Sequence, residues 1–433
     1  MAKTKKASSA QAESTSPAER TRWFVQDRFG LFIHWGLYAI PARGEWVRNR
    51  ESLSDEAYQP YFDAFNPVRY DPRRWAALAR RAGQKYAVMT VKHHDGFCLF
   101  DSKLTDFKAT RTPAGRDLVR EYVEAFRAEG LKVGFYYSLL DWHHPHYPVA
   151  DKHHPMRASA AMLAQKRDFS KYVEYLHGQV RELLTNYGRI DVMWFDFSYD
   201  GMSGEKWQAT KLAKRVRSLQ PHILLDNRLV GGLTDLGWGA AKGDFASPEQ
   251  IIPPEGVVAP DGKPAVWEAC ITINDHWGYA RDDKNFKSAA QIVRMLVECA
   301  SKGGNLLLNV GPTALGEIQP EFVERLEAVG RWMEYNDESI YGCGRADFPK
   351  LEWGYYTRKG KTLYAHILMK PAGPIALAGL GGKVRKARLL ADGSEVSLSR
   401  PWMIGKDTTD AFMTLPPTNL PDPIDTVVAL ELA

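Results

Sequence analysis

Residues 29–51, FGLFIHWGLYAIPARGEWVRNRE, begin as an apolar run and end as a polar loop rich in tryptophan and charge. The run predicts a buried strand that leads directly into His34 and Trp35, and the loop then brings Glu45 and Trp46. Polar side chains of this kind are costly to bury unless another group pairs with them. We therefore expect this strand to end at a site where other polar groups pair with these side chains.

The same alternation of an apolar run with an amphipathic helical pattern recurs along the chain. The remaining strands are expected at 86–94, 132–138, 190–196, 222–228, 265–273 and 305–312. Apolar strands separated by helices are typical of a parallel sheet covered by helices. Seven such units favour an α/β protein with a (β/α)8-like barrel that has one irregular strand. An open Rossmann sheet would instead need a glycine-rich turn after its first strand, where this chain has IHWG.

The pattern changes after about residue 346 to alternating runs such as KTLYAHILM (361–369) and TVVALELA (426–433). Turns rich in Pro, Gly and Asp separate these runs, so they predict a small antiparallel β-sandwich. The expected division is a disordered tail over 1–20, a catalytic barrel over 21–346 and the sandwich over 347–433.

Composition excludes several classes of protein. The 433 residues carry a net charge of +5 without a basic stripe, so no nucleic-acid partner is expected. No apolar stretch approaches the roughly 18 residues of a membrane span. The cysteines lack CxxC spacing, which predicts buried thiols rather than a zinc site or a disulfide framework. They are Cys98, Cys270, Cys299 and Cys343.

The N-terminal segment has a basic start but no apolar core, so it does not read as an export signal. A periplasmic or secreted location is expected only if a signal has been removed, and a cytoplasmic one otherwise. The sequence does not predict the oligomeric state.

Polar or aromatic side chains end most of the expected strands. They are His34, Trp35, His93, His94, Tyr136, Tyr137, Trp194, Asp196, Asn227, Arg228, Glu268 and Asn309. The carboxyl ends of barrel strands build the active-site face, so these groups are expected to converge. Carboxylates and hydrogen-bonding groups among tryptophans suit a neutral polyhydroxylated ring, which stacks on aromatic faces while its hydroxyls are held.

A metal centre is the competing interpretation, because KHHDGF (92–97) and the loop 141–159 are rich in histidine. The first strand, however, carries no HxH pair. Adjacent residues of a strand also point to opposite faces, so only one of His93 and His94 is expected to point into the site. We therefore expect no metal.

In order along residues 20–345, the chain carries FGLFIHWG, GEW, KHHDGF, YYSLLDW, DVMWFD, DNR, GDFASPEQ, WEACITINDHWGY and SKGGNLLLNVGP. Together these motifs resemble the α-L-fucosidases of glycoside hydrolase family 29. The resemblance implies a (β/α)8-like barrel with a C-terminal β-sandwich. It also implies hydrolysis of terminal α-L-fucose from fucosylated glycans or glycoconjugates with retention, through a covalent fucosyl-enzyme and without a cofactor.

The resemblance assigns roles residue by residue. Asp196 matches the nucleophile, and Glu249 is our choice for the acid/base, with Glu255 and Glu268 as alternatives. The substrate-binding candidates are His34, Glu45, Trp46, His93, His94, Tyr136, Trp194, Arg228 and Glu268.

Two other functions stay open at this point: a catalytically silent fucose-binding protein, and a glycosidase for another sugar. The linkage that is cut is not predicted. The loop 141–159, with His143, His144 and His146, is expected to shape the site of the leaving group.

Overall fold

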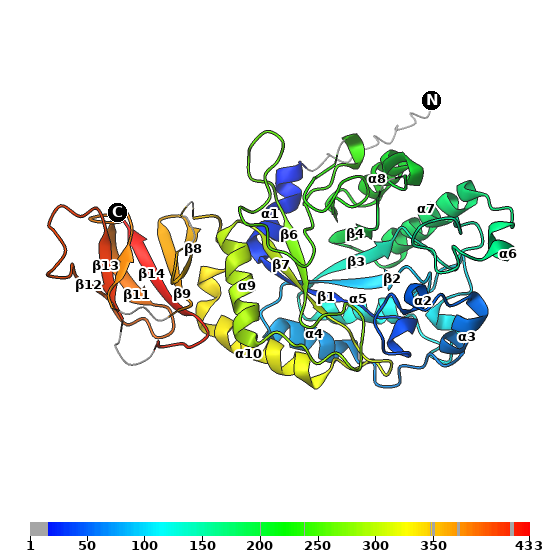
Figure 1. Cartoon of the computed structure of the whole chain (residues 1–433), viewed down its shortest axis with the longest axis horizontal. Coiled ribbons are helices and arrows are strands. Elements are labelled where there is room, and N and C mark those ends of the chain that lie inside the picture. The colour runs from blue at the N-terminus through cyan, green and yellow to red at the C-terminus, as the bar shows by residue number, and fades with distance from the viewer. Residues whose placement is uncertain are drawn as a thin grey trace, which may run out of the picture.

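A curled parallel sheet of seven strands forms the centre of the protein (Figure 1). The structure is a computed structural model that describes residues 16–433 apart from 200, 238, 347, 349–350, 370–372 and 416–419. The strands are β1 Phe29–Ile33, β2 Tyr86–Lys92, β3 Lys132–Ser138, β4 Val192–Asp196, β5 Leu224–Leu225, β6 Glu268–Thr272 and β7 Asn305–Val310. Their order is β5-β4-β3-β2-β1-β7-β6, so β5 and β6 are the two edges.

An irregular segment, residues 245–249, joins these two edges. Parallel bridges pair Phe245 with Asp226 just beyond β5, Ala246 with Trp267 just before β6, and Glu249 with Cys270 in β6. The segment therefore stands where an eighth strand would close the barrel. This arrangement confirms the (β/α)8-like fold, and it explains why only seven regular strand-and-helix units are visible in the sequence.

The helices between the strands follow the expected periodicity. They are α4 Pro72–Arg81, α5 Leu118–Ala128, α7 Phe169–Asn186, α8 Ala209–Leu219, α9 Ala289–Ser301 and α10 Pro320–Asn336. Three of them begin after an aspartate whose side chain accepts a hydrogen bond from a first-turn backbone N–H, namely Asp71, Asp117 and Asp168. Such N-caps satisfy donors that have no partner within the helix.

Several shorter elements have no counterpart in the expected pattern. They are α2 Val47–Arg50, α3 Asp55–Asp63, α6 Ala160–Leu163 and the 3-10 turns η1 Leu37–Ala39, η2 Ala109–Arg111, η3 Gly204–Trp207, η4 Gly239–Ala241 and η5 Asp337–Ser339. Most of them lie in the loops that follow the strands. No helix in the described part of the chain is long and apolar enough to cross a bilayer.

The N-terminal end corrects one expectation. Helix α1 spans Pro17–Asp27, so residues 17–20 do not belong to a disordered tail. Ser16 and Glu19 form a capping box at its start, and Phe24 is buried against the ring of Phe245 with centroids 4.7 Å apart. The Ser-x-x-Glu spacing and Pro17 are the features of the sequence that predict the start of this helix. Residues 1–15 lie outside the described part of the chain.

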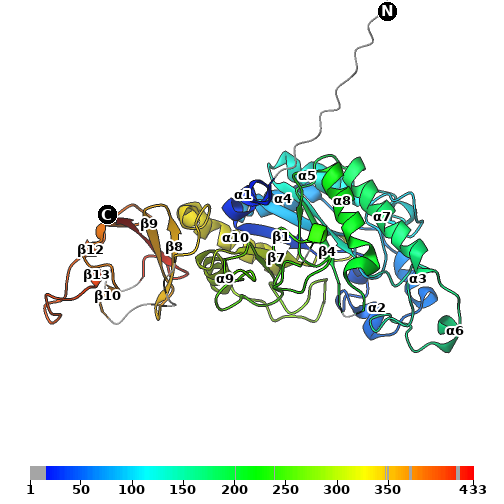
Figure 2. The same ribbon diagram turned by 90° about the horizontal axis from the view of Figure 1, so that it is seen from above.

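The C-terminal strands lie at one end of the molecule, next to α9 and α10 (Figures 1 and 2). They are β8 Gly354–Lys359, β9 Thr362–Ile367, β10 Ile375–Leu377, β11 Val384–Leu389, β12 Ser397–Leu398, β13 Ala411–Thr414 and β14 Thr426–Leu432. They form two antiparallel sheets, β11-β14-β9-β8 and β10-β13-β12, which share a buried apolar core. The predicted boundary at 346–347 falls beside residue 347, which is outside the described residues, and it stays a prediction.

A buried polar network connects these strands to the barrel side. The Nδ1 of His366 in β9 donates to Asp425 at 2.7 Å, and both side chains are fully buried. The indole of Trp332 in α10 donates to the Asp425 carbonyl at 3.1 Å, while the Thr357 hydroxyl lies 3.1 Å from His366 Nε2. The packing of the sheet against α10 therefore depends on a paired histidine and aspartate without access to water.

Replacing Asp425 with alanine should lower the free energy of unfolding by about 3 kcal/mol, because it leaves the polar ring of His366 buried without its partner. Urea unfolding followed by tryptophan fluorescence measures this change. Asp407→Ala removes an exposed aspartate from the same region and serves as the control. Equal stability of the two variants would contradict the role given to the buried pair.

Candidate active site

The centre of the site is Asp196, the last residue of β4. Its Oδ1 lies 2.8 Å from Arg228 Nη1, and its Oδ2 accepts a hydrogen bond of 2.6 Å from the Tyr136 hydroxyl. Burial and the neighbouring charge of Asp196 raise the pKa of Tyr136 well above its ordinary value, so the phenol keeps its proton. Both oxygens of this carboxylate are thus held in place.

Glu249 supplies a second carboxylate beside the first. Its Oε2 lies 2.8 Å from the same Arg228 Nη1, so this oxygen and Asp196 Oδ1 are no more than 5.6 Å apart, the sum of the two 2.8 Å contacts. The Glu249 side chain is 33% exposed, whereas that of Asp196 is 11% exposed. One carboxylate therefore lies deep in the site and the other is open to water.

Arg228 itself is buried and held rigidly. Its Nε donates to the Ser247 hydroxyl and its Nη2 to the Ser247 carbonyl, each at 3.0 Å, and its guanidinium lies 4.4 Å from the Trp194 ring centroid. Burial acts to lower the pKa of Arg228, but the charges of Asp196 and Glu249 outweigh it and raise the pKa above its ordinary value. The arginine therefore stays charged between the two carboxylates.

His34, just after β1, has a defined tautomer. Asn309 donates through its amide nitrogen to the Trp277 carbonyl at 2.8 Å, so its amide oxygen accepts from His34 Nδ1 at 2.7 Å. Burial lowers the pKa of His34 to about 3, which keeps the ring neutral. Its Nε2 is therefore a hydrogen-bond acceptor.

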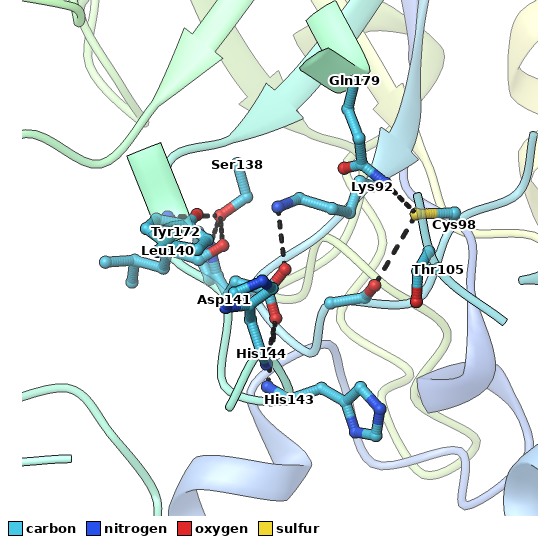
Figure 3. Close-up of polar contacts among 12 residues, drawn as sticks. Lys92, Cys98, Thr105, Ser138, Leu140, Asp141, His143, His144, Tyr172 and Gln179 are labelled. Atoms are coloured by element: carbon cyan, nitrogen blue, oxygen red, sulfur yellow. Dashed lines mark hydrogen bonds and ion pairs between the residues drawn. The ribbon is translucent and has the colours of Figure 1, made fainter. Parts of the chain in front are cut away.

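The same reasoning applies to His94. The Ser138 hydroxyl accepts from the Leu140 N–H at 3.0 Å and donates its one hydrogen to the Leu140 carbonyl at 2.9 Å. Figure 3 shows Ser138 beside Leu140. His94 Nδ1, 2.6 Å from Ser138 Oγ, must then be the donor of that contact. His94 Nε2 is left as an acceptor, and it lies 3.9 Å from Asp196 Oδ2.

His93 and His94 both line the cavity, so the expectation that only one points inward was wrong. Strand β2 ends at Lys92, and its register against β3 already shifts between Thr90 and Lys92. The two histidines therefore lie beyond the region where side chains alternate between faces. The His93 ring stacks on Tyr136, with centroids 5.4 Å apart and planes 9° apart.

A buried ion pair between Lys92 and Asp141 stabilises the turn that carries His93 and His94 (Figure 3). Lys92 Nζ contacts Asp141 Oδ2 at 3.0 Å, with both side chains almost fully buried. Asp141 also accepts from the backbone N–H of His143 and His144, and the next residue, Trp142, donates its N–H to the His94 carbonyl at 2.8 Å. The pair thereby connects the His93–His94 turn to the loop after β3.

The cavity collects most of the predicted residues. It is lined by Phe32, His34, Trp46, His93, His94, Tyr136, Trp194, Asp196, Phe197, Arg228, Glu249, Cys270 and Trp277. Sequence reasoning missed four of them: Phe32, Phe197, Cys270 and Trp277. Phe197 directly follows Asp196, and Trp277 lies in the quoted motif WEACITINDHWGY, so two of these residues had a signal. All four cysteines are buried free thiols, as predicted.

Glu268 does not reach the cavity. It is the first residue of β6, at the opposite end of the barrel from Asp196, and it accepts a hydrogen bond from the Tyr86 hydroxyl. Burial raises its pKa to about 8. Its expected substrate contact is therefore corrected: the strand begins at Glu268 rather than ending there. Glu255, the other alternative acid/base, has a side chain that is 83% exposed, and it lies 3.8 Å from Arg345 rather than at Arg228.

Glu45 lies behind the cavity wall rather than in it. Its carboxylate accepts from the Gly278 N–H at 2.9 Å. Trp46 and Trp277, the sequence neighbours of these two residues, both line the cavity. Glu45 therefore ties together the two loops that carry these tryptophans, and its predicted contact with the sugar stays a prediction.

Two further observations concern alternatives to this site. Among the described residues, no group of three or more His, Cys, Asp or Glu side chains is arranged to hold a metal ion.

A larger groove of about 740 Å³ lies along α4 and the loop before α10. Its charged groups are engaged in ion pairs, as in Arg69 with Glu317 and Arg74 with Asp71, so we place no chemistry there.

Comparisons with known proteins agree with this geometry. A family model described as alpha-L-fucosidase matches residues 1–338. Tissue alpha-L-fucosidase of Bos taurus is 32% identical over 81% of this chain and 75% of its own length.

Solved structures are similar as well. Alpha-L-fucosidase isoenzyme 1 from Paenibacillus thiaminolyticus is 60% identical with a TM-score of 0.95, covering 97% of this chain and 100% of that one. A family 29 fucosidase from Bacteroides thetaiotaomicron, trapped as a covalent intermediate with 2-fluoro-fucosyl fluoride, is 29% identical with a TM-score of 0.83 over 98% of each chain. The chain therefore belongs to the alpha-L-fucosidase family, glycoside hydrolase family 29.

Proposed function

We propose that Asp196 and Glu249 carry out the retaining hydrolysis of terminal α-L-fucosides in this protein. The observation that carries the proposal is that both carboxylates bind one guanidinium nitrogen, which limits their separation to 5.6 Å. Retaining glycosidases place their carboxyl groups about 5 to 5.5 Å apart, and inverting enzymes need about 6.5 to 9.5 Å to admit a water. The trapped covalent intermediate of the Bacteroides relative supports the same mechanism.

The first step forms a covalent fucosyl-enzyme. The Asp196 carboxylate attacks the anomeric carbon while the bond to the leaving-group oxygen breaks, and Glu249 gives that oxygen its proton. In the second step Glu249 takes a proton from water, whose oxygen attacks the same carbon and releases Asp196. The greater exposure of Glu249 suits it to exchange protons with the leaving group and with water.

The buried histidines suit the hydroxyls of the sugar. His34 and His94 each present a neutral Nε2 acceptor, while the Tyr136 hydroxyl and the Arg228 guanidinium already donate to Asp196. A sugar hydroxyl can therefore donate a hydrogen bond to either histidine, because neither ring is a cation. His93 adds a ring nitrogen, Nδ1, that has no hydrogen-bond partner within the described residues.

The apolar part of the cavity accounts for the preference for fucose. Phe32, Trp46, Trp194 and Trp277 give it aromatic walls. The C5 methyl group of L-fucose can pack on such a surface, whereas the hydroxymethyl group of an ordinary hexose would bury an unpaired hydroxyl there. This physical difference favours L-fucose over the related sugars left open by the sequence.

Asp196→Ala should reduce kcat for 4-nitrophenyl α-L-fucoside by about 10⁴-fold or more, because no group remains to form the covalent intermediate. Added azide should restore part of the rate and yield β-L-fucosyl azide, since the small anion fits where the carboxylate was removed. Nitrophenolate release and mass spectrometry measure both effects. Asp63→Ala, an exposed aspartate, is the control. Retained activity in Asp196→Ala would refute the assignment.

Glu249→Gln should lower kcat/KM for a fucosyl disaccharide by about 10² to 10⁴-fold, because a poor leaving group needs its proton during bond cleavage. Hydrolysis of α-L-fucosyl fluoride, whose leaving group needs far less help, should fall much less. Glu255→Gln tests the alternative acid/base and should leave both rates as in the parent protein. A loss confined to Glu255→Gln would move the role to that residue.

A further inference from the structure

Four aromatic side chains form a cluster beside Asp196, which we call the aromatic platform: Trp46, His153, Phe197 and Tyr199. Their rings contact one another with centroids 4.8 to 5.8 Å apart, and the ring of His153 touches each of the other three. All four side chains are only partly buried, so the platform keeps a surface accessible to solvent.

The platform begins inside the cavity and continues outside it. Trp46 and Phe197 line the cavity together with Asp196, whereas His153 and Tyr199 are not among its lining residues. Phe197 directly follows Asp196 and has a φ of 83°, a backbone conformation that bulky side chains rarely adopt. This conformation directs the ring onto Trp46 and His94, where the centroid distances are 5.5 and 4.9 Å.

Three separate segments hold the platform in place. The Tyr199 hydroxyl donates to Asp151, which also accepts from Tyr147 at 3.0 Å, and thus connects the loop after β4 to the loop after β3. The side chain of Asn49 in α2 donates to the His153 carbonyl. The rings are therefore fixed before any ligand arrives, which lowers the entropy lost on binding.

The charges next to the platform are already engaged. Asp151 accepts hydrogen bonds from the two phenols and from the His153 N–H at 2.7 Å. Lys152 Nζ lies 4.5 Å from the centroid of the Tyr199 ring. A ligand here would therefore meet aromatic faces rather than an unpaired ion.

We propose that the aromatic platform binds the leaving group of the substrate, and that it takes a neutral sugar ring through an apolar C–H face. This inference rests on the proposed function, because it requires fucose to lie in the cavity with its anomeric carbon at Asp196. The leaving group then extends from the cavity mouth over Phe197 toward His153 and Tyr199. Aromatic rings are well suited to this contact because they offer a large apolar area with little loss of conformational entropy.

This assignment changes the expectation for the histidine-rich loop. The His143 ring stacks on Phe107 at 3.9 Å, and the His144 ring packs on Tyr175 at 4.5 Å, so neither belongs to the platform. His146 accepts a hydrogen bond of 3.2 Å from the Asp168 N–H, just before α7. His153 of this loop contacts Trp46 and Phe197, two residues that line the cavity.

The test compares substrates with and without a leaving-group sugar. The kcat/KM of the full-length protein is measured on α-L-fucosyl fluoride and on α1,2-, α1,3-, α1,4- and α1,6-linked fucosyl disaccharides. The variants are His153→Ala, Tyr199→Ala and Tyr199→Phe, with His146→Ala as a control of the same residue type on the same loop. The leaving group of α-L-fucosyl fluoride is not a sugar and does not occupy the platform. The rate of its hydrolysis therefore reports on folding and on the catalytic groups.

His153→Ala and Tyr199→Ala should lower kcat/KM about tenfold more for the best disaccharide than for the fluoride, a value typical of one lost aromatic contact. Tyr199→Phe keeps the ring and should retain most of the rate on the disaccharide. Equal losses on both substrates, no loss on the disaccharide, or cleavage of the fluoride but of no disaccharide would overturn the proposal. Failure of the parent protein to hydrolyse even the fluoride would instead refute the proposed function.

Discussion

Arg228 places two carboxylates of different exposure around a single guanidinium nitrogen, and most features of the site depend on this contact. Without the cation, Asp196 and Glu249 would repel each other at this short distance, and one of them would have to bind a proton or move away. The charge of Arg228 offsets this repulsion, so a deep carboxylate and a more exposed one lie together in the cavity, as the proposed mechanism requires.

The same contact links the chemistry to the closure of the barrel. Segment 245–249 bridges β5 and β6, and it also carries Ser247 and Glu249, which bind Arg228 from that side. Ser247 and Glu249 are two residues apart, the spacing that places side chains on one face of an extended chain. Closing the barrel and completing the carboxylate pair are thus achieved by one stretch of chain.

Much of the fold could be predicted because its signals are local. The apolar runs gave the strands and the 3.6-residue periodicity gave the helices, while residues at strand ends gave Asp196, Arg228 and the histidines. The predictions that were wrong concerned strand boundaries, which depend on pairing between distant parts of the chain. Glu268 was misplaced because an apolar run does not mark where pairing begins, and the pairing of β6 starts at that residue.

His93 and His94 were misjudged for a related reason. The alternation rule holds only within a strand, and β2 ends at Lys92, two residues before the predicted end at residue 94. The aromatic platform was invisible for another reason, since Trp46, His153 and Tyr199 come from three loops that meet only after folding. Side-chain contacts between distant loops leave no periodic trace in a sequence.

The most direct test of the central claim is to trap the covalent intermediate. The protein is incubated with 2-deoxy-2-fluoro-α-L-fucosyl fluoride, which slows both steps and leaves the sugar on the enzyme, and the labelled peptide is identified by mass spectrometry. We predict one fluorofucosyl group per chain, attached to Asp196. A label on another carboxylate, or fluoride release at full rate without any labelled protein, would contradict the account.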